Sequence, residues 1–415
     1  MMPAAAVARE GGTFPSRRFW PHDLVLVLLP LLIGFEVLLW TVYLPHGRQG
    51  IADFRQLYTG GYMLRTGHGA KLYDYDTQQH FEDTLVPVKV EFPLLISHLA
   101  YEELLFVPLS LLSYRVAYWV FMAFNGALLV VCVGLLSLRF RVLSDRWKCF
   151  PALLLASFYP ITRTLTEGQD SIIMLTLLMA ALWALDHEKE FAAGLLVGIG
   201  IFKFQIVIPI ALLFLVWRRW RFSAGFASSS VAAGLVSLWL VGLGGARQYA
   251  NMLLSMSLRL ASSADMRRYT TDPREMINLR GLISVIFDGK LPHGYVQFLV
   301  VASSVAVLLA AARQRPSLPL AIAAGSLVSY HLIDHDATIL IIVIAAALCS
   351  GSIWKGVVAA SLLVAPLCAT IPPWGYLAAI PLLGLFLLML GRAPERSALA
   401  AGVRQNAIAG GSPCG

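Results

Sequence analysis

Charged residues are scarce in this chain. Only 13% of its 415 residues are Asp, Glu, Lys or Arg, whereas 58% are hydrophobic, and the mean hydropathy is +0.71. A soluble fold of this length needs more polar surface than such a composition supplies. The sequence therefore excludes an ordinary soluble protein and predicts an all-α integral membrane protein.

Several motifs are also missing. The five cysteines lack the spacing of a disulfide framework or a zinc site, and no GxxxxGK phosphate loop occurs. No polar segment is long enough for a separate nucleotide domain, and we find no internal repeat. We expect no cofactor and no nucleic-acid partner, because the net charge of +8 fits contact with anionic lipids better.

Apolar stretches dominate what remains. A spanning helix needs about 20 mainly apolar residues, and we predict about twelve spans of full or reduced length. They are Leu24–Leu44, Val116–Leu138, Cys149–Ile161, Ser171–Leu185, Phe191–Ile201, Ile206–Trp217, Phe222–Leu243, Gly294–Ala312, Ser317–Leu332, Thr338–Ser350, Gly356–Ile371 and Tyr376–Leu390. The stretch Phe92–Leu112 carries Glu102 and Glu103 at its centre, so we expect it at the interface or folded back into the protein.

Basic residues at the helix ends predict the orientation. Arg17 and Arg18 precede the first span, and further arginines follow later spans on the same side, which places both termini in the cytoplasm. The first apolar run is too long for a cleavable signal peptide. We expect a cytoplasmic segment 1–22, a membrane domain 23–391 with long outer loops at 45–115 and 244–293, and a disordered cytoplasmic tail 392–415.

The first outer loop concentrates acidic residues. An apolar spacing close to the helical period follows Asp53 and predicts an interfacial helix that Gly67 could end. Asp53 is either the N-cap of this helix or a catalytic base, and both roles can hold together. Asp74 is read as a turn residue or as a substrate contact, and Tyr58 is a further candidate contact.

Three further segments bring polar groups to predicted outer turns. Lys203 ends an apolar run, where an unpaired lysine is costly unless its ammonium reaches the membrane surface or meets an anion, and we favour an anion. Glu167 and Gln169 lie in TLTEGQDS at a helix entrance, where they either cap the helix or bind substrate hydroxyls. Arg280 in NLRGL is a candidate phosphate ligand through its planar donor group, or an ordinary surface arginine.

The segment HLIDHD holds two histidines four residues apart, His331 and His335. On one helical face they could bind a divalent metal, although a hydrogen-bonded network with Asp334 and Asp336 is the simpler interpretation. We do not predict a metal, and we include both histidines among the candidate substrate-binding residues.

Six segments follow one another in the order DFRQLYTGGYMLRTGHGAKLYD, FPLL, LLFVPLSLLSYRVAYWVFMAFNGALL, YPITRTLTEGQDSIIMLTLLMAALWAL, AAGLLVGIGIFKFQIVIPIALLFLVWRRWR and SYHLIDHDATILIIVIA. This ordered series resembles glycosyltransferase family 87. The resemblance runs from about residue 50 to 350. It differs from the family pattern at FPLL, which replaces an aromatic-Pro-Pro string, and after Lys203, where Phe-Gln stands.

This resemblance implies a GT-C type helical bundle and a polyprenyl-phosphate sugar donor. It implies transfer, with inversion, of a sugar such as mannose to a lipid-linked or envelope glycan acceptor at the outer face of the cell membrane. It also implies Asp53 as general base and His335 as a phosphate or sugar contact.

Two other classes of protein remain. A secondary transporter or flippase for a lipid-linked or anionic solute would also have broken helices and intramembrane charge, but its charges would line a path through the bilayer. A non-catalytic assembly or lipid-binding protein would tolerate Asp53→Asn.

Overall fold

The computed structural model describes residues 21–391, except 92, 259–271, 288 and 372. The predicted tail 392–415 and nearly all of the predicted segment 1–22 lie outside this part of the chain. Within the described ranges the secondary structure is helical and includes no strand. The all-helical class predicted from composition is therefore confirmed.

The first half of the chain forms two long helices, an irregular cap and a series of short helices. In chain order these are α1 (Pro21–Gln49), α2 (Phe54–Arg65), η1 (Gly69–Lys71), α3 (Tyr75–Leu85), η2 (Glu102–Leu105), η3 (Leu109–Leu111), α4 (Tyr114–Arg139), α5 (Arg141–Arg146), α6 (Phe150–Ala156), α7 (Tyr159–Glu167), α8 (Ser171–Asp186), α9 (Glu190–Ile199) and η4 (Gly200–Lys203).

The second half completes the bundle. Its elements are α10 (Phe204–Val216), α11 (Trp220–Leu258), η5 (Pro273–Glu275), α13 (Leu279–Phe287), α14 (His293–Ala312), α15 (Leu318–Val328), η6 (His335–Ile339), α16 (Leu340–Leu348), α17 (Ile353–Val364), η7 (Ala365–Thr370), η8 (Gly375–Ala378) and α18 (Ala379–Leu390). Helix α11 breaks at Gly242, whose φ is 67°, and it continues through residues 244–258, which we had assigned to an outer loop.

Six helical stretches of the described chain are long and apolar enough to cross a membrane. They are Val25–Arg65, Tyr114–Arg139, Glu190–Val216, Trp220–Ser255, His293–Ala312 and Ile353–Thr370, and four shorter apolar helices accompany them. The spans predicted at Phe191–Ile201 and Ile206–Trp217 form a single stretch that breaks at Lys203, where φ and ψ are −103° and 57°. The total of twelve spans stays a prediction.

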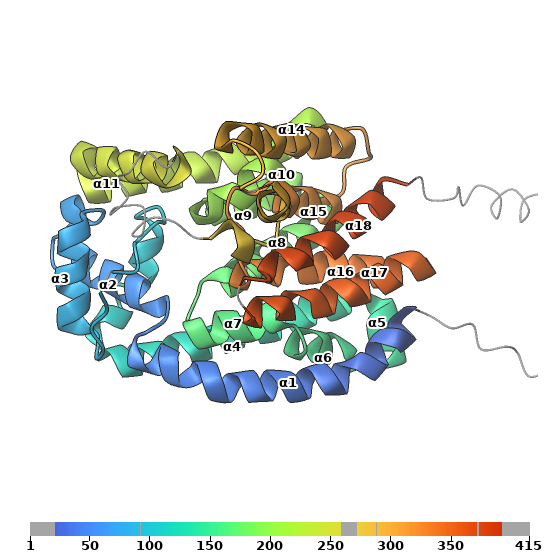
Figure 1. Ribbon diagram of the computed structural model, residues 1–415, viewed down its shortest axis with the longest axis horizontal. Helices are drawn as coiled ribbons and strands as arrows, with labels where there is room; N and C mark the ends of the chain where they lie inside the picture. The colour runs from blue at the N-terminus through green and yellow to red at the C-terminus, as the bar shows by residue number, and fades with distance from the viewer. Residues whose placement is uncertain (1–20, 92, 259–271, 288, 372, 392–415) are drawn as a thin grey trace, which may run out of the picture.

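Two regions are distinct in Figure 1. Helices α2 and α3 form a cap at one end of the elongated molecule, whereas α1 begins and α18 ends toward the other end. The main apolar core lies in the bundle, and α16 at its centre is apolar on all sides because it is buried. The predicted helix after Asp53 is present as α2, and Gly67 follows it with a φ of +78°.

Helices α9 and α11 pack at close range through small residues. A Cβ atom on Gly194 would lie 2.0 Å from the Phe222 carbonyl oxygen, and one on Gly225 would lie 2.1 Å from the Phe191 carbonyl oxygen. Glycines spaced in this way let two membrane helices approach until their backbones touch. This contact fixes α9, and with it the helix break at Lys203.

Substitution of Gly194 tests this packing. Gly194→Ala is expected to force α9 and α11 apart and to reduce stability by about 1–3 kcal/mol. The measurement is thermal unfolding of the purified protein in lipid nanodiscs. Gly234→Ala in α11 is the matched control, because no atom lies within 4 Å of its added Cβ; equal unfolding midpoints for the two variants would contradict the packing argument.

Candidate active site

The structure brings four of the residues predicted to form the site together where the cap meets the bundle. Asp53 lies at the start of α2, Glu167 ends α7, Gln169 lies in the turn between α7 and α8, and His335 begins η6. The Gln169 side-chain nitrogen donates a 2.7 Å hydrogen bond to Asp53 Oδ2. His335 Nδ1 lies 3.1 Å from Glu167 Oε2 and 3.8 Å from Asp53 Oδ2.

The sharp turn after α7 depends on Gly168. Its φ of +68° lies in the left-handed region, and an added Cβ would approach the Phe54 side chain to 2.7 Å. Glycine is the residue that adopts this conformation without steric cost. The turn therefore places Glu167 and Gln169 directly against the first residues of α2.

Asp53 is held by Gln169 at hydrogen-bond distance and faces His335 at the longer distance of 3.8 Å. Its side chain makes no capping hydrogen bond to α2, so the structure does not support the N-cap interpretation. The side chain is 22% exposed, and the nearest ring nitrogen of His335 is beyond hydrogen-bond distance. Asp53 thus presents a carboxylate that a substrate hydroxyl can reach.

Glu167 is more tightly paired. Arg163, one turn earlier on α7, lies 2.5 Å from its Oε1, and His335 contacts its other oxygen. Burial, followed by the negative charge of Asp53, raises the pKa of Glu167 to about 7. Glu167 therefore holds its proton more strongly than an ordinary carboxyl group does.

Lys203 does not face outward toward an anion, as we had favoured. Its ammonium lies 2.7 Å from Asp170 Oδ1 and 2.6 Å from Asp336 Oδ1, and its side chain is 2% exposed. Although burial alone would raise the pKa of Asp170, the charges of Lys203 and His98 hold it below its usual range. Two buried carboxylates of the protein supply the anionic partners that this lysine requires.

The remaining candidates have other contacts. The Tyr58 hydroxyl donates to the Leu112 carbonyl at 2.7 Å, and Asp74 caps α3 by accepting from the Thr77 backbone N–H at 3.0 Å. Arg280 donates to the Tyr330 carbonyl and lies over the Tyr330 ring. The roles of Tyr58, Asp74 and Arg280 in substrate binding stay predictions.

His331 and His335 do not share a helical face, because residues 331–333 are irregular and the 3₁₀ helix η6 begins only at His335. Burial lowers the pKa of His331 to about 4, so it is neutral near pH 7. The i, i+4 spacing that suggested a metal site is therefore not realised as helical geometry.

Sequence reasoning missed several residues of this cluster. Arg163 bridges Glu167 and Asp334, and Tyr159 donates to Asp334 at 3.0 Å. The i, i+4 spacing of Arg163 and Glu167 in a short helix was a usable signal. His98, which approaches Asp170 to 3.2 Å, had no comparable signal because it lies in an irregular segment.

Two groups of side chains in the described chain could hold a metal ion. One is Asp53, Glu167 and His335, and the other is His98, Glu102 and Asp170; within each group the potential ligand atoms lie within 4.8 Å of one another. Lys203 lies next to the second group, because its ammonium contacts Asp170.

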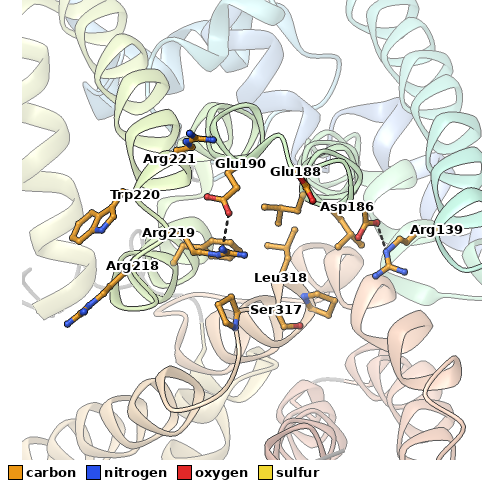
Figure 2. Close-up of a pocket in the computed structure, with 15 residues that line it drawn as sticks. Arg139, Asp186, Glu188, Glu190, Arg218, Arg219, Trp220, Arg221, Ser317 and Leu318 are labelled. Carbon is orange, nitrogen blue, oxygen red and sulfur yellow. Dashed lines mark ion pairs between the residues drawn. The ribbon is translucent and has the colours of Figure 1, made fainter. Parts of the chain in front are cut away.

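A cavity of about 810 Å³ lies away from these residues (Figure 2). Arg139 pairs with Asp186 at 2.5 Å, and Arg219 pairs with Glu190 at 3.1 Å. None of the candidate site residues lines this cavity, and its basic side chains belong to the turns that we predict to be cytoplasmic. It is therefore separate from the candidate active site.

Comparison with known proteins identifies the family. The model of glycosyltransferase family 87 matches residues 103–333, more than half of the chain. The chain therefore belongs to glycosyltransferase family 87, as its resemblance had indicated. Glu167, Gln169, Lys203 and Arg280 lie within the matched range, whereas Asp53 and His335 lie outside it.

Two curated relatives are similar to parts of this chain. The chain is 28% identical over 242 residues to the polyprenol-phosphate-mannose-dependent alpha-(1-2)-phosphatidylinositol pentamannoside mannosyltransferase of Mycolicibacterium smegmatis. This match covers 56% of the present chain and 54% of the relative. It is 31% identical over 120 residues to an alpha-(1->3)-arabinofuranosyltransferase of Corynebacterium glutamicum. This match covers 28% of the present chain and 28% of the relative. The chain thus spans about half or less of these relatives, and no solved structure matches it.

Removal of the Lys203 charge tests the buried ion pairs. Lys203→Met is expected to reduce the free energy of unfolding by about 3–5 kcal/mol, because it leaves two buried carboxylates without their cation. The triple variant K203M/D170N/D336N should recover part of this loss. Thermal unfolding in nanodiscs is the measurement, the exposed Lys71→Met is the control, and wild-type stability of K203M would contradict the assignment.

Proposed function

We propose that the chain transfers a sugar, most simply mannose, from polyprenyl phosphate to a lipid-linked or envelope glycan acceptor at the outer face of the membrane. Membership of glycosyltransferase family 87 supports the reaction class. The relative from Mycolicibacterium smegmatis is a polyprenol-phosphate-mannose-dependent phosphatidylinositol pentamannoside mannosyltransferase, which supports a similar donor and a lipid-linked acceptor. The single observation that carries the proposal is the partly exposed Asp53 carboxylate within the polar cluster.

Asp53 suits the role of general base better than its acidic neighbours do. Asp170 and Asp336 are buried and neutralised by Lys203, and Glu167 is paired with Arg163. Asp53 receives only the neutral hydrogen bond from Gln169 at short range. A base must be accessible and able to accept a proton, and Asp53 meets both conditions.

The reaction requires one such carboxylate. Asp53 takes the proton from the acceptor hydroxyl while the hydroxyl oxygen bonds to the anomeric carbon. The bond between that carbon and the phosphate oxygen breaks from the opposite face, and polyprenyl phosphate leaves with the electron pair. The configuration at the anomeric carbon is inverted, and no covalent sugar–enzyme intermediate forms.

The leaving phosphate needs positive charge or hydrogen-bond donors. Arg163 is the best placed cation, because its side chain is 26% exposed and it lies one helical turn from Glu167. His335 adjoins both Asp53 and Glu167 and is our second candidate. Lys203 contributes indirectly, since it fixes Asp170 next to Gln169.

A secondary transporter is the alternative. Charged clusters at one end of the bundle, where the cap meets it, favour a surface reaction over a path through the bilayer. We further propose that this end faces outward and that both chain termini are cytoplasmic, in agreement with the basic turns.

Asp53→Asn is the first test. It is expected to lower sugar transfer by about 10²–10⁴-fold, because the amide cannot accept the proton. The assay measures transfer from radiolabelled polyprenyl-phosphate sugars to a membrane glycolipid extract by protein purified in lipid. Asp76→Asn, an exposed acid in the same cap, is the matched control.

Equal transfer by D53N and the wild type would remove Asp53 from the mechanism. Transfer by neither the wild type nor D76N from any polyprenyl donor would favour the transporter.

The pH dependence of transfer provides a second test. Burial and the neighbouring Asp53 carboxylate raise the pKa of Glu167 to about 7, so Glu167 becomes negatively charged as the pH increases through that value. Ionised Glu167 strengthens the ion pairs with Arg163 and His335 beside Asp53, and transfer is therefore expected to increase through about pH 7. In Glu167→Gln this rise should be absent. An active E167Q with an unchanged pH profile would contradict this coupling.

A further inference from the structure

A second polar cluster lies beside the candidate active site. His98 and Glu102 come from the irregular segment between α3 and α4, and Asp170 precedes α8. His98 Nδ1 lies 2.8 Å from Glu102 Oε2 and 3.2 Å from Asp170 Oδ2. Their side chains are 13%, 4% and 0% exposed, so this cluster is buried.

One imidazole nitrogen lies between the two carboxyl groups of this cluster, because His98 Nδ1 contacts both Glu102 Oε2 and Asp170 Oδ2. Glu102 and Asp170 are themselves hydrogen-bond partners when Glu102 carries a proton. A divalent cation that replaces this proton would find three ligands already close together.

The spacing also fits a divalent cation. Ligand atoms about 2.1 Å from an ion and at right angles to each other lie about 3.0 Å apart. The two measured separations of 2.8 and 3.2 Å bracket that value. One imidazole nitrogen with two carboxylate oxygens is a ligand set for Mn²⁺ or Zn²⁺.

The excess of buried carboxyl groups around this cluster also favours a bound cation. Glu103 is fully buried, both its oxygens lack a hydrogen-bond partner among the described residues, and it adjoins Gly60 of α2. Asp170 and Asp336 share Lys203, and Asp336 also lies 3.7 Å from His335 Nε2, whereas Glu102 and Glu103 are buried without a lysine or arginine contact among the described residues. Buried carboxylates are costly unless they are paired or coordinate a metal.

The ligands are held in place by neighbouring contacts. Lys203 occupies Asp170 Oδ1 and leaves Oδ2 toward His98. Tyr73 donates to the His98 carbonyl at 2.8 Å, and the Tyr101 backbone N–H donates to Ser237 of α11 at 3.1 Å. Such outer contacts are typical of metal sites, where they orient the ligands.

We propose that His98, Glu102 and Asp170 bind a divalent cation that joins the segment between α3 and α4 to the turn before α8. The ion lies outside the Asp53 cluster and holds Asp170 next to Gln169, which contacts Asp53. Its role is to position the active site, and the binding itself does not depend on the proposed transfer reaction.

The test measures Mn²⁺ binding to the full-length protein in nanodiscs after treatment with EDTA. The signal of free Mn²⁺ in electron paramagnetic resonance reports the bound fraction. We expect one Mn²⁺ per wild-type chain, and a loss of affinity greater than about tenfold in both His98→Gln and Glu102→Gln. Mn²⁺ should also raise the thermal unfolding midpoint of the wild type but not that of E102Q.

Two controls make the outcome specific. Glu36→Gln alters another buried glutamate that belongs to neither group of possible metal ligands, and Asp53→Asn alters the other group. Both should bind Mn²⁺ as the wild type does. The proposal is overturned if the wild type binds no Mn²⁺, if H98Q and E102Q bind it normally, or if D53N alone abolishes binding.

Discussion

The buried ion pairs of Lys203 are the constraint on which the polar end of the bundle depends. A lysine in an apolar interior is stable only when carboxylates neutralise it at close range. Asp170 and Asp336 do so from the start of α8 and from η6, so three distant segments converge on one ammonium group. Gln169 and His335 are the direct neighbours of these two acids. The placement of both residues around Asp53 follows from the satisfaction of one buried charge.

The cap brings Asp53 to this place through a second buried pair. Arg55 is fully buried, its Nε donates to Glu82 of α3 at 2.6 Å, and its Nη1 donates to the Gly50 and Val88 carbonyls. These contacts fix the chain on either side of Asp53 relative to α3. Gly168 then lets the turn after α7 approach Phe54. Polar contacts position the cap, whereas the bundle beneath it is held together by apolar packing and by close approach at glycines.

The sequence predicted what depends on local pattern and missed what depends on long-range pairing. Apolar run length located the helices, and the spacing after Asp53 located α2 and its end near Gly67. The partners of Lys203 lie 33 and 133 residues away in sequence, so no local pattern could show that it is neutralised within the protein. The same reason hid His98, which lies in an irregular segment. Arg163 was predictable in principle, since its partner Glu167 lies one helical turn away.

The two clusters on either side of Lys203 differ in a way that indicates different roles. Around Asp53 the carboxylate is partly exposed, and its hydrogen-bond donor is a neutral amide. Around His98 the groups are almost fully enclosed, and two carboxyl groups face one imidazole nitrogen. An accessible carboxylate can exchange protons with a substrate, whereas an enclosed group of ligands is suited to a structural ion. Because Asp170 and Gln169 are adjacent, a change in the enclosed cluster would be transmitted to Asp53 through one turn of backbone.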